Sequence, residues 1–139
     1  GTLYIERSKR KDALRMVKDM ADAMKEGDVV AVFPEGTTSD GRDLLPFHAN
    51  LIQSAILADA PVQPMSLKFI DARTGETSWA PCYIGDDTLI GSMWRTLSAP
   101  PILAVVHFGE PQRAQGRDRR QWASDLRQDI IRLRDTDPI

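Results

Sequence analysis

The segment Val29-Val30-Ala31-Val32-Phe33-Pro34-Glu35-Gly36-Thr37-Thr38-Ser39 decides which fold the sequence predicts. Its first five residues form a continuous apolar run, which is typical of a short strand buried on both faces. Pro34 has no backbone N–H and cannot continue a central ladder, so the strand is expected to end there. Because ligands bind at the carboxyl ends of strands in open α/β sheets, the polar groups of residues 35–39 are candidate site residues. They also fit an ordinary turn with helix-capping hydroxyls.

A second short strand is predicted at residues 2–5, and it ends at Glu6-Arg7. The residues between the two strands predict a helix, with Ser8 as a candidate N-cap and Gly27 just past its end. Apolar residues recur there at helical spacing: Leu14, Val17, Met20, Ala21 and Met24. Strand, helix and strand over about thirty residues form a βαβ unit, in which the two strands are parallel. Arg7 and residues 35–37 are therefore expected to face one crevice.

The rest of the chain predicts further elements of a single α/β domain. These are a helix at 47–58, strands at 62–69 and 102–108, a hairpin turn at 71–77 leading into 78–84, and helices at 89–97 and 118–134. The apolar stripe of the helix at 89–97 is interpreted as core, with an acyl-chain groove as the alternative. The stripe of the last helix is interpreted as docked on the domain rather than on a membrane. The predicted fold is a mostly parallel sheet flanked by helices, with one hairpin.

Composition is that of an ordinary globular protein and removes several functional classes. With 139 residues, 42% of them hydrophobic, the chain is long enough for one domain with a real core. A net charge of −2 gives no overall attraction to nucleic acid or anionic lipid, although the cations within residues 7–15 form either a solvated face or an electropositive mouth for a phosphate. The single cysteine, Cys82, excludes an internal disulfide, and no apolar run approaches the roughly twenty residues that cross a bilayer. The sequence has no Walker loop, dinucleotide fingerprint or metal-ligand cluster.

Three segments resemble motifs of the glycerolipid acyltransferases of the lysophosphatidic acid acyltransferase type. Residues 33–39 resemble the third motif of that family, Phe-Pro-Glu-Gly-Thr-Arg-Ser, and residues 1–7 resemble its second, an aliphatic-aromatic strand ending in an acidic residue and Arg. Residues 62–67 are similar to the fourth, a hydrophobic strand with an internal proline. The order and spacing agree, and the resemblance covers residues 1–110. In one departure, Thr38 stands where the family has Arg, and Arg42 is a candidate substitute for that cation.

The resemblance implies an enzyme of phospholipid biosynthesis at the cytoplasmic face of a membrane. It would transfer an acyl chain from acyl-CoA or acyl carrier protein to the free hydroxyl of 1-acylglycerol 3-phosphate or a related lysophospholipid. The implied substrate-binding residues are Arg7, Glu35, Gly36, Thr37, Thr38 and Arg42. Arg7 would clamp the phosphate, Glu35 and Gly36 would position the glycerol and the backbone, and Thr37 would assist. The implied partners are this acceptor, the acyl donor and a membrane surface, without a cofactor, a metal or nucleic acid.

The first motif of the family, His followed by four residues and Asp, is absent from the sequence. His48 and His107 are followed at that spacing by Ile52 and Pro111, so they are interpreted as a loop or helix-start residue and a strand residue. A hydroxyl attacks a thioester poorly without a base near neutrality. We therefore expect residues 1–139 to be an amino-terminally truncated acyltransferase-like domain, soluble and inactive alone, with no catalytic residue of its own.

Two other functions stay open at this point. One is a non-catalytic module of the same fold that binds an anion or a lipid headgroup. The other is a hydrolase that uses Ser39 or Ser66, which is the weaker alternative because no Gly-x-Ser-x-Gly elbow is present.

Overall fold

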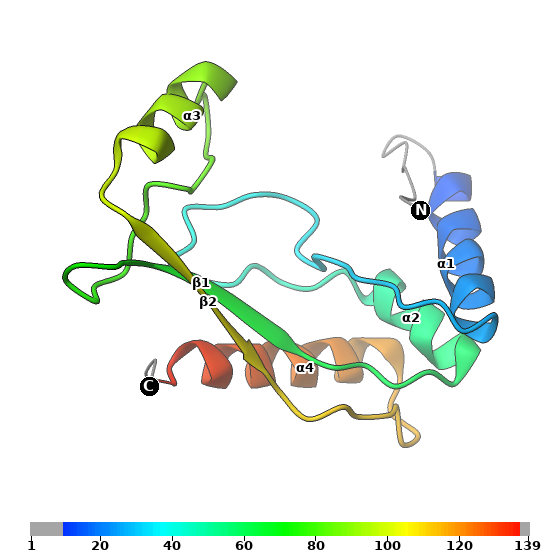
Figure 1. Cartoon of the computed structure of the whole chain (residues 1–139). Helices are drawn as coiled ribbons and strands as arrows, with labels where there is room; N and C mark the ends of the chain where they lie inside the picture. The colour runs from blue at the N-terminus through cyan, green and yellow to red at the C-terminus, as the bar shows by residue number, and fades with distance from the viewer. Residues whose placement is uncertain (1–9, 137–139) are drawn as a thin grey trace.

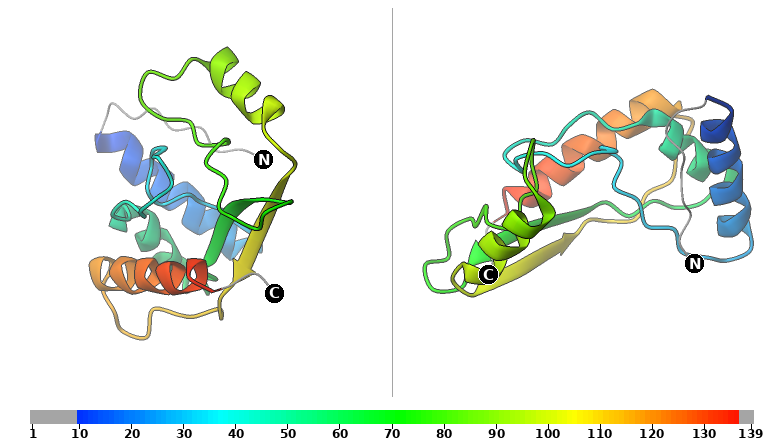
Figure 2. Two further views of the ribbon diagram at one scale, coloured as in Figure 1. Left: turned by 90° about the vertical axis from the view of Figure 1, so that its left-hand side faces the viewer. Right: turned by 90° about the horizontal axis from the view of Figure 1, so that it is seen from above.

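The computed structural model describes residues 10–136. In chain order its elements are α1 (Arg10–Lys25), α2 (Ala49–Ala58), β1 (Met65–Asp71), α3 (Leu89–Ser98), β2 (Ile102–Phe108) and α4 (Arg119–Arg134). The two strands form an antiparallel ribbon, and α4 runs alongside it (Figure 1). The helices α1 and α2 pack together at one end of the ribbon, while α3 stands at the other end (Figures 1 and 2).

The core lies between α2 and α4. One cluster of buried side chains joins the two helices: Ile52, Ala55, Trp122, Ala123 and Leu126. Trp122 is 0% exposed, and a fully buried indole is among the largest apolar surfaces that one side chain can remove from water. The prediction that the last helix docks on the domain through its apolar stripe is therefore confirmed.

The helix α1 adds a second layer against α2. Val17, Met20 and Ala21 form its buried face, as their spacing predicts. Leu14 was predicted on the same face, but its side chain is 70% exposed, so that prediction is wrong. The helix ends at Lys25, and Gly27 lies just past its end, as predicted. The φ of Gly27, 96°, is left-handed and lets the N–H of Asp28 donate to the carbonyl of Ala23 at 3.0 Å.

The sheet differs from the prediction. The strands at 62–69 and 102–108 form, the first as Met65–Asp71, but they pair with each other antiparallel, with Met65 opposite Phe108 and Asp71 opposite Ile102. The segment between them returns the chain to the end of β1, where the N–H of Ala72 donates to the carbonyl of Pro101 at 2.8 Å. The prediction of a mostly parallel sheet is therefore wrong for the described residues, and mixed α/β is the correct coarser class. The hairpin turn at 71–77 is confirmed by the bridge between Ile70 and Thr77, although residues 78–84 form no strand.

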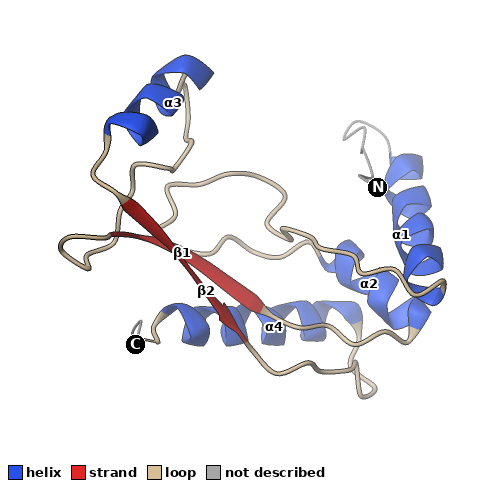
Figure 3. Ribbon diagram, in the orientation of Figure 1, coloured by secondary structure: helices blue, strands red, loops and turns tan. Residues whose placement is uncertain are grey.

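The segment 29–33 is not a strand in the structure. It belongs to the long loop between α1 and α2 in Figure 3, and Val29 and Phe33 are 97% and 83% exposed. An apolar run forms a central strand only where neighbouring strands pair with its N–H and C=O groups. The described residues provide no such neighbour for this run. Its predicted partner at 2–5 lies outside the described residues, as does the candidate N-cap Ser8, so the parallel pairing stays a prediction.

Candidate functional site

The glycine motif lies in a loop whose two ends meet. The carbonyl of Pro34 accepts a hydrogen bond from the N–H of His48 at 2.8 Å, and we call residues 34–48 the motif loop. A turn begins the loop, because the N–H of Gly36 donates to the carbonyl of Phe33 at 3.1 Å. The loop, cyan to teal in Figure 1, leaves the helical end of the molecule, reaches toward the ribbon and returns to α2.

Glu35 turns its carboxylate back into the motif loop. Its Oε2 accepts a hydrogen bond from the backbone N–H of Leu45 at 2.7 Å, and the residue is half-buried. A carboxylate that accepts from a backbone N–H makes a strong, charge-assisted bond. Glu35 therefore holds the two sides of the loop together, while its other oxygen has no hydrogen-bond partner among the described residues and is available to a ligand.

Gly36 is required by both its backbone and its surroundings. Its φ of 70° is in the left-handed region, where a residue with a Cβ is strained. A Cβ at this position would lie 2.7 Å from Cδ2 and Nε2 of His48. The imidazole therefore packs directly on the Gly36 backbone. This contact was missed by sequence reasoning, although His48 does begin α2 as its N-cap residue, as interpreted.

Turns and an aromatic contact shape the distal part of the motif loop. The Ser39 hydroxyl accepts from the N–H of Gly41 at 3.1 Å, and the Asp40 carboxylate accepts from the N–H of Arg42 at 3.0 Å. The Arg42 guanidinium lies 3.7 Å from Asp40 and stacks 5.6 Å from the centre of the Trp79 ring. The proposed substitute cation is therefore exposed but already engaged by an anion and an aromatic face.

Two arginines of α4 bind the backbone of the motif loop. Nε of Arg127 donates to the carbonyls of Leu44 and Leu45 at 3.1 and 3.2 Å, and the Arg134 guanidinium donates to the carbonyls of Gly41 and Arg42 at 2.6 and 3.1 Å. The two arginines are seven residues apart and so share one helix face. Sequence reasoning missed them, because it considered only the apolar stripe of this helix; their spacing of two turns was the signal that could have found them.

The ribbon in turn fixes the end of α4 that carries Arg134. Nζ of Lys68 donates to the carbonyls of Arg134 and Thr136, each at 3.2 Å, so a cation caps the negative end of the helix. Nδ1 of His107 lies 2.8 Å from the carbonyl of Leu133, which makes that nitrogen a donor. His107 is thus a strand residue with a structural hydrogen bond, as interpreted from the sequence.

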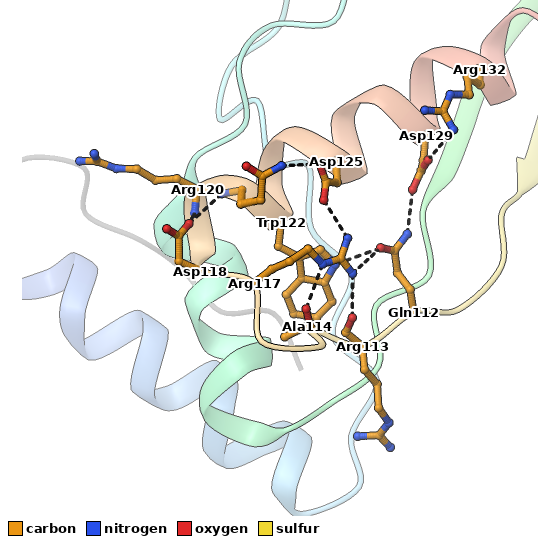
Figure 4. A network of polar contacts seen from close by, with 11 residues as sticks. Gln112, Arg113, Ala114, Arg117, Asp118, Arg120, Trp122, Asp125, Asp129 and Arg132 are labelled. Carbon is orange, nitrogen blue, oxygen red and sulfur yellow. Dashed lines mark hydrogen bonds and ion pairs between the residues drawn. The ribbon is translucent and has the colours of Figure 1, made fainter.

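The other end of α4 is held by a network around Arg117 (Figure 4). Its guanidinium donates to Asp125 at 3.0 Å, to the Gln112 side chain at 2.9 Å and to nearby backbone carbonyls, and it stacks 5.4 Å from the centre of the Trp122 ring. Trp122 donates from its indole N–H to the same Gln112 oxygen at 3.2 Å. The hydrogen bond from Arg117 lowers the pKa of Asp125 below its usual value. The network anchors the helix that carries Arg127 and Arg134.

The predicted site residues are only partly brought together. Glu35, Gly36, Thr37 and Thr38 occupy one turn at the start of the motif loop, with both threonines exposed, and Arg42 lies on its distal side. Arg7 lies outside the described residues, so its place at the same crevice stays a prediction. Two surface hollows in the described part lie elsewhere, one beside Gln53 and the start of α4, the other between the ribbon and the end of α4.

With this geometry in view, comparison with known proteins identifies the chain. A family model described as Acyltransferase matches residues 1–68. The chain is 32% identical over 130 residues to lyso-ornithine lipid O-acyltransferase of Pseudomonas aeruginosa, which covers 94% of this chain and 49% of that protein. It is 37% identical over 108 residues to 1-acyl-sn-glycerol-3-phosphate acyltransferase of Neisseria gonorrhoeae, covering 78% and 42%. No solved structure matches the chain.

These findings give the class of the chain, which is similar to acyltransferases. More particularly, the chain belongs to the glycerolipid acyltransferase family, as the three motifs implied. It spans about half the length of the curated relatives it matches. Among the described residues, none of the helices combines the length and the apolar character needed to cross a membrane.

Proposed function

We propose that the whole protein transfers an acyl chain from acyl-CoA or acyl carrier protein to 1-acylglycerol 3-phosphate, giving phosphatidic acid for phospholipid synthesis at the cytoplasmic face of a membrane. The observation that carries this proposal is the motif loop, with its Glu35–Leu45 hydrogen bond and its glycine-dependent turn. The 37% identity to the Neisseria gonorrhoeae enzyme supports the same acceptor. The acyl donor is an activated thioester, so the proposed reaction uses no cofactor.

In this proposal, residues 1–139 bind and orient the acceptor, and an upstream His-x4-Asp motif of the whole protein supplies the base. The imidazole would take the proton of the acceptor hydroxyl as that oxygen attacks the thioester carbonyl, and the thiolate would leave. Arg7 would bind the phosphate, with Thr37, Thr38 and Arg42 near it, while Glu35 fixes the loop. In the whole protein, residues 29–33 would pair in parallel with residues 2–5 and extend the sheet.

The test follows thiol release from an acyl thioester with lysophosphatidic acid as acceptor. Residues 1–139 alone should give background release, the whole protein should turn over, and replacing its upstream His by Ala should cost about 10²–10⁴-fold. Arg7→Ala should raise the KM for the acceptor by roughly tenfold or more, because a charged hydrogen bond contributes about 1.5–3 kcal/mol. If the whole protein lacks the motif and releases no thiol with any lysophospholipid, the acyltransferase proposal fails and a headgroup-binding module replaces it.

Glu35 can be tested with a matched pair of variants in the whole protein. Glu35→Gln keeps an oxygen that can accept from the Leu45 N–H at the same distance, but it removes the charge. Glu35→Ala removes both. A loss of turnover in Glu35→Ala alone indicates that the carboxylate positions the loop, whereas an equal loss in both variants indicates that its charge acts on the substrate.

A second acceptor, a lyso-ornithine lipid, is supported by a specific observation. Thr38 stands where the family has Arg, and the Arg42 guanidinium is already engaged by Asp40 and Trp79. A site with fewer free cations suits a headgroup without phosphate, and ornithine is an amino acid that carries none. The 32% identity to the Pseudomonas aeruginosa protein extends over 94% of this chain.

The two acceptors can be separated by Thr38→Arg in the whole protein. If the natural acceptor is a lyso-ornithine lipid, the wild type should prefer it, and the added guanidinium should shift the ratio of kcat/KM values toward lysophosphatidic acid by roughly tenfold. A wild type that already prefers lysophosphatidic acid contradicts the ornithine acceptor and leaves the first proposal in place. Ser39→Arg is the matched control for a cation at the adjacent position.

A further inference from the structure

The helix α3 is amphipathic, and its apolar side faces solvent. Five large apolar residues are between 54% and 81% exposed: Leu89, Ile90, Met93, Trp94 and Leu97. At 100° per residue they all fall within a sector of about 140°. We call these five residues the α3 face. They were interpreted from the sequence as core, and for the described residues that interpretation is wrong.

The polar side of α3 is the side that packs against the protein. Ser92 is buried, and the Thr96 hydroxyl lies within hydrogen-bond distance of the Ala80 carbonyl, at 3.2 Å. Arg95 donates to the carbonyls of Ala80 and Cys82 and to the Asp87 carboxylate at 2.9 Å. The helix is therefore held to the segment 80–87 by its polar groups. It packs against no other described helix or strand, and it stands clear of the body in Figure 1 and in the left view of Figure 2.

This orientation is the reverse of the usual one for a helix on a water-soluble surface, where polar groups face water. Because leaving large apolar side chains in water is unfavourable, five exposed ones on a single face indicate a surface that is covered in use. None of the five residues of the α3 face is charged, and the one charged residue of the helix, Arg95, is paired with Asp87 at 2.9 Å. A charge-free face with a tryptophan is complementary to the boundary between lipid headgroups and acyl chains.

The segment that leads into α3 contacts the motif loop. A Cβ on Gly41 would lie 3.1 Å from Sγ of Cys82 and 3.4 Å from the Trp79 ring, so the segment that carries α3 packs directly on the loop. Arg42 stacks on the same Trp79 ring. A lipid surface in contact with α3 would therefore be held close to the loop that we propose binds a lipid acceptor.

We propose that α3 is an interfacial helix, which lies in the plane of a lipid bilayer with Leu89, Ile90, Met93, Trp94 and Leu97 inserted among the lipids. The inference rests on the proposed function, because an enzyme with a lipid acceptor and a lipid product works where both are found. At ten residues, α3 is far too short to span the bilayer and lies on it instead. Because the α3 face has no cations, binding depends on apolar insertion and persists at high salt.

The test measures partition of residues 1–139 onto extruded phosphatidylcholine vesicles by co-sedimentation at high salt. Wild type should bind, and Ile90→Glu and Trp94→Glu should each weaken the partition coefficient at least tenfold, equivalent to about 1.4 kcal/mol. Leu14→Glu is the matched control and should leave partition unchanged. Leu14 is an apolar residue, 70% exposed, on α1, and that helix lies at the opposite end of the molecule from α3 (Figure 1). Circular dichroism establishes that each variant is folded.

A second measurement locates the contact. Brominated acyl chains in the vesicles should quench part of the tryptophan fluorescence, and Trp94→Phe, which keeps the face apolar, should remove that part while vesicle binding remains. Binding that is unchanged by Ile90→Glu and Trp94→Glu would overturn the proposal, as would absence of binding. So would a dimer in the absence of lipid that these variants convert to a monomer, since a second copy would then cover the α3 face. Protection of Met93 from oxidation in the lipid-free whole protein, but not in residues 1–139, would also overturn it, since another part of the protein would then cover the face. None of these readouts uses turnover, so a failure of the proposed acyl transfer is separately visible.

Discussion

Two helices of this molecule carry a tryptophan in an apolar stripe, and the structure treats them in opposite ways. On α4, Trp122 is 0% exposed in the core with α2; on α3, Trp94 is 74% exposed. The stripes are similar as sequence patterns, with large apolar residues three and four apart. The difference lies in what each helix uses to attach itself: α4 attaches through its apolar side and α3 through Ser92, Arg95 and Thr96. An amphipathic pattern thus predicts a face but not what covers it.

The largest expected effect is on the free energy of unfolding when either tryptophan is replaced. Trp122→Ala should lower the free energy of unfolding by about 3–5 kcal/mol, because it leaves a cavity between α2 and α4. Trp94→Ala should change it by less than about 0.5 kcal/mol, because the indole is already in solvent. Urea unfolding followed by far-ultraviolet circular dichroism measures both. A similar loss in the two variants would contradict the exposed placement of α3.

The next effect concerns the motif loop, in which the His48 side chain packs on the backbone of Gly36. Gly36→Ala combines strain at φ 70° with an overlap against His48, whereas Gly75→Ala has the same strain at φ 75° with open space around it. Each should lose about 1–2 kcal/mol from the backbone, and Gly36→Ala about 1–3 kcal/mol more from the overlap. Urea midpoints give the difference. Adding His48→Ala should recover the extra loss in a double-mutant cycle, and no recovery would rule out the contact.

A smaller effect tests whether α4 supports the motif loop as well as the core. Arg127→Met removes the donors to the carbonyls of Leu44 and Leu45 and should cost about 1–2 kcal/mol. Arg119→Met makes the same chemical change on an exposed position of the same helix and should cost less than about 0.5 kcal/mol. Hydrogen exchange at the amide of Leu45 should speed up in the first variant alone. Equal exchange in both would show that the loop holds itself.

The sequence predicted the elements that depend on local periodicity, but it did not predict which strands pair with one another. The four helices follow from apolar spacing, and two of them begin at residues whose side chains accept from the first turn, Thr88 and Asp118. The strand at 102–108 was predicted at its correct bounds. The pairing direction was not, because a continuous apolar run says that a strand is covered without saying by which neighbour. Residues 29–33 have the composition of a central strand, yet they remain unpaired in the described structure.

The candidate site could also be predicted only in part. The turn at Glu35-Gly36 was found because glycine and proline mark backbone geometry directly. The contacts that hold the motif loop were not predicted. The His48 imidazole packs on the backbone of Gly36, twelve residues earlier, and Arg127 donates to the carbonyl of Leu44, 83 residues away in the sequence. Such contacts leave no periodic signal, since their distance along the chain is set by the fold. The carboxylate of Glu35 was correctly singled out, but its bond to Leu45 could be seen only in the structure.

The smallest expected effect comes from removing the aspartate that pairs with an arginine at each of the helices α3 and α4. Hydrogen bonding to Arg95 lowers the pKa of Asp87 at the base of α3, and hydrogen bonding to Arg117 lowers the pKa of Asp125 on α4. A carboxyl with a lowered folded-state pKa stabilises the fold above its unfolded value, near 3.8, and the stabilisation is lost as pH falls through the lowered pKa. Because α4 belongs to the core, Asp125→Asn should reduce the urea midpoint at neutral pH and flatten its decline below pH about 4. Because α3 touches no other helix or strand of the described chain, Asp87→Asn should leave the midpoint almost unchanged and instead speed hydrogen exchange in α3. A fall in the global midpoint for Asp87→Asn as large as that for Asp125→Asn would mean that α3 unfolds together with the core, and the contrast between the two helices would then be wrong.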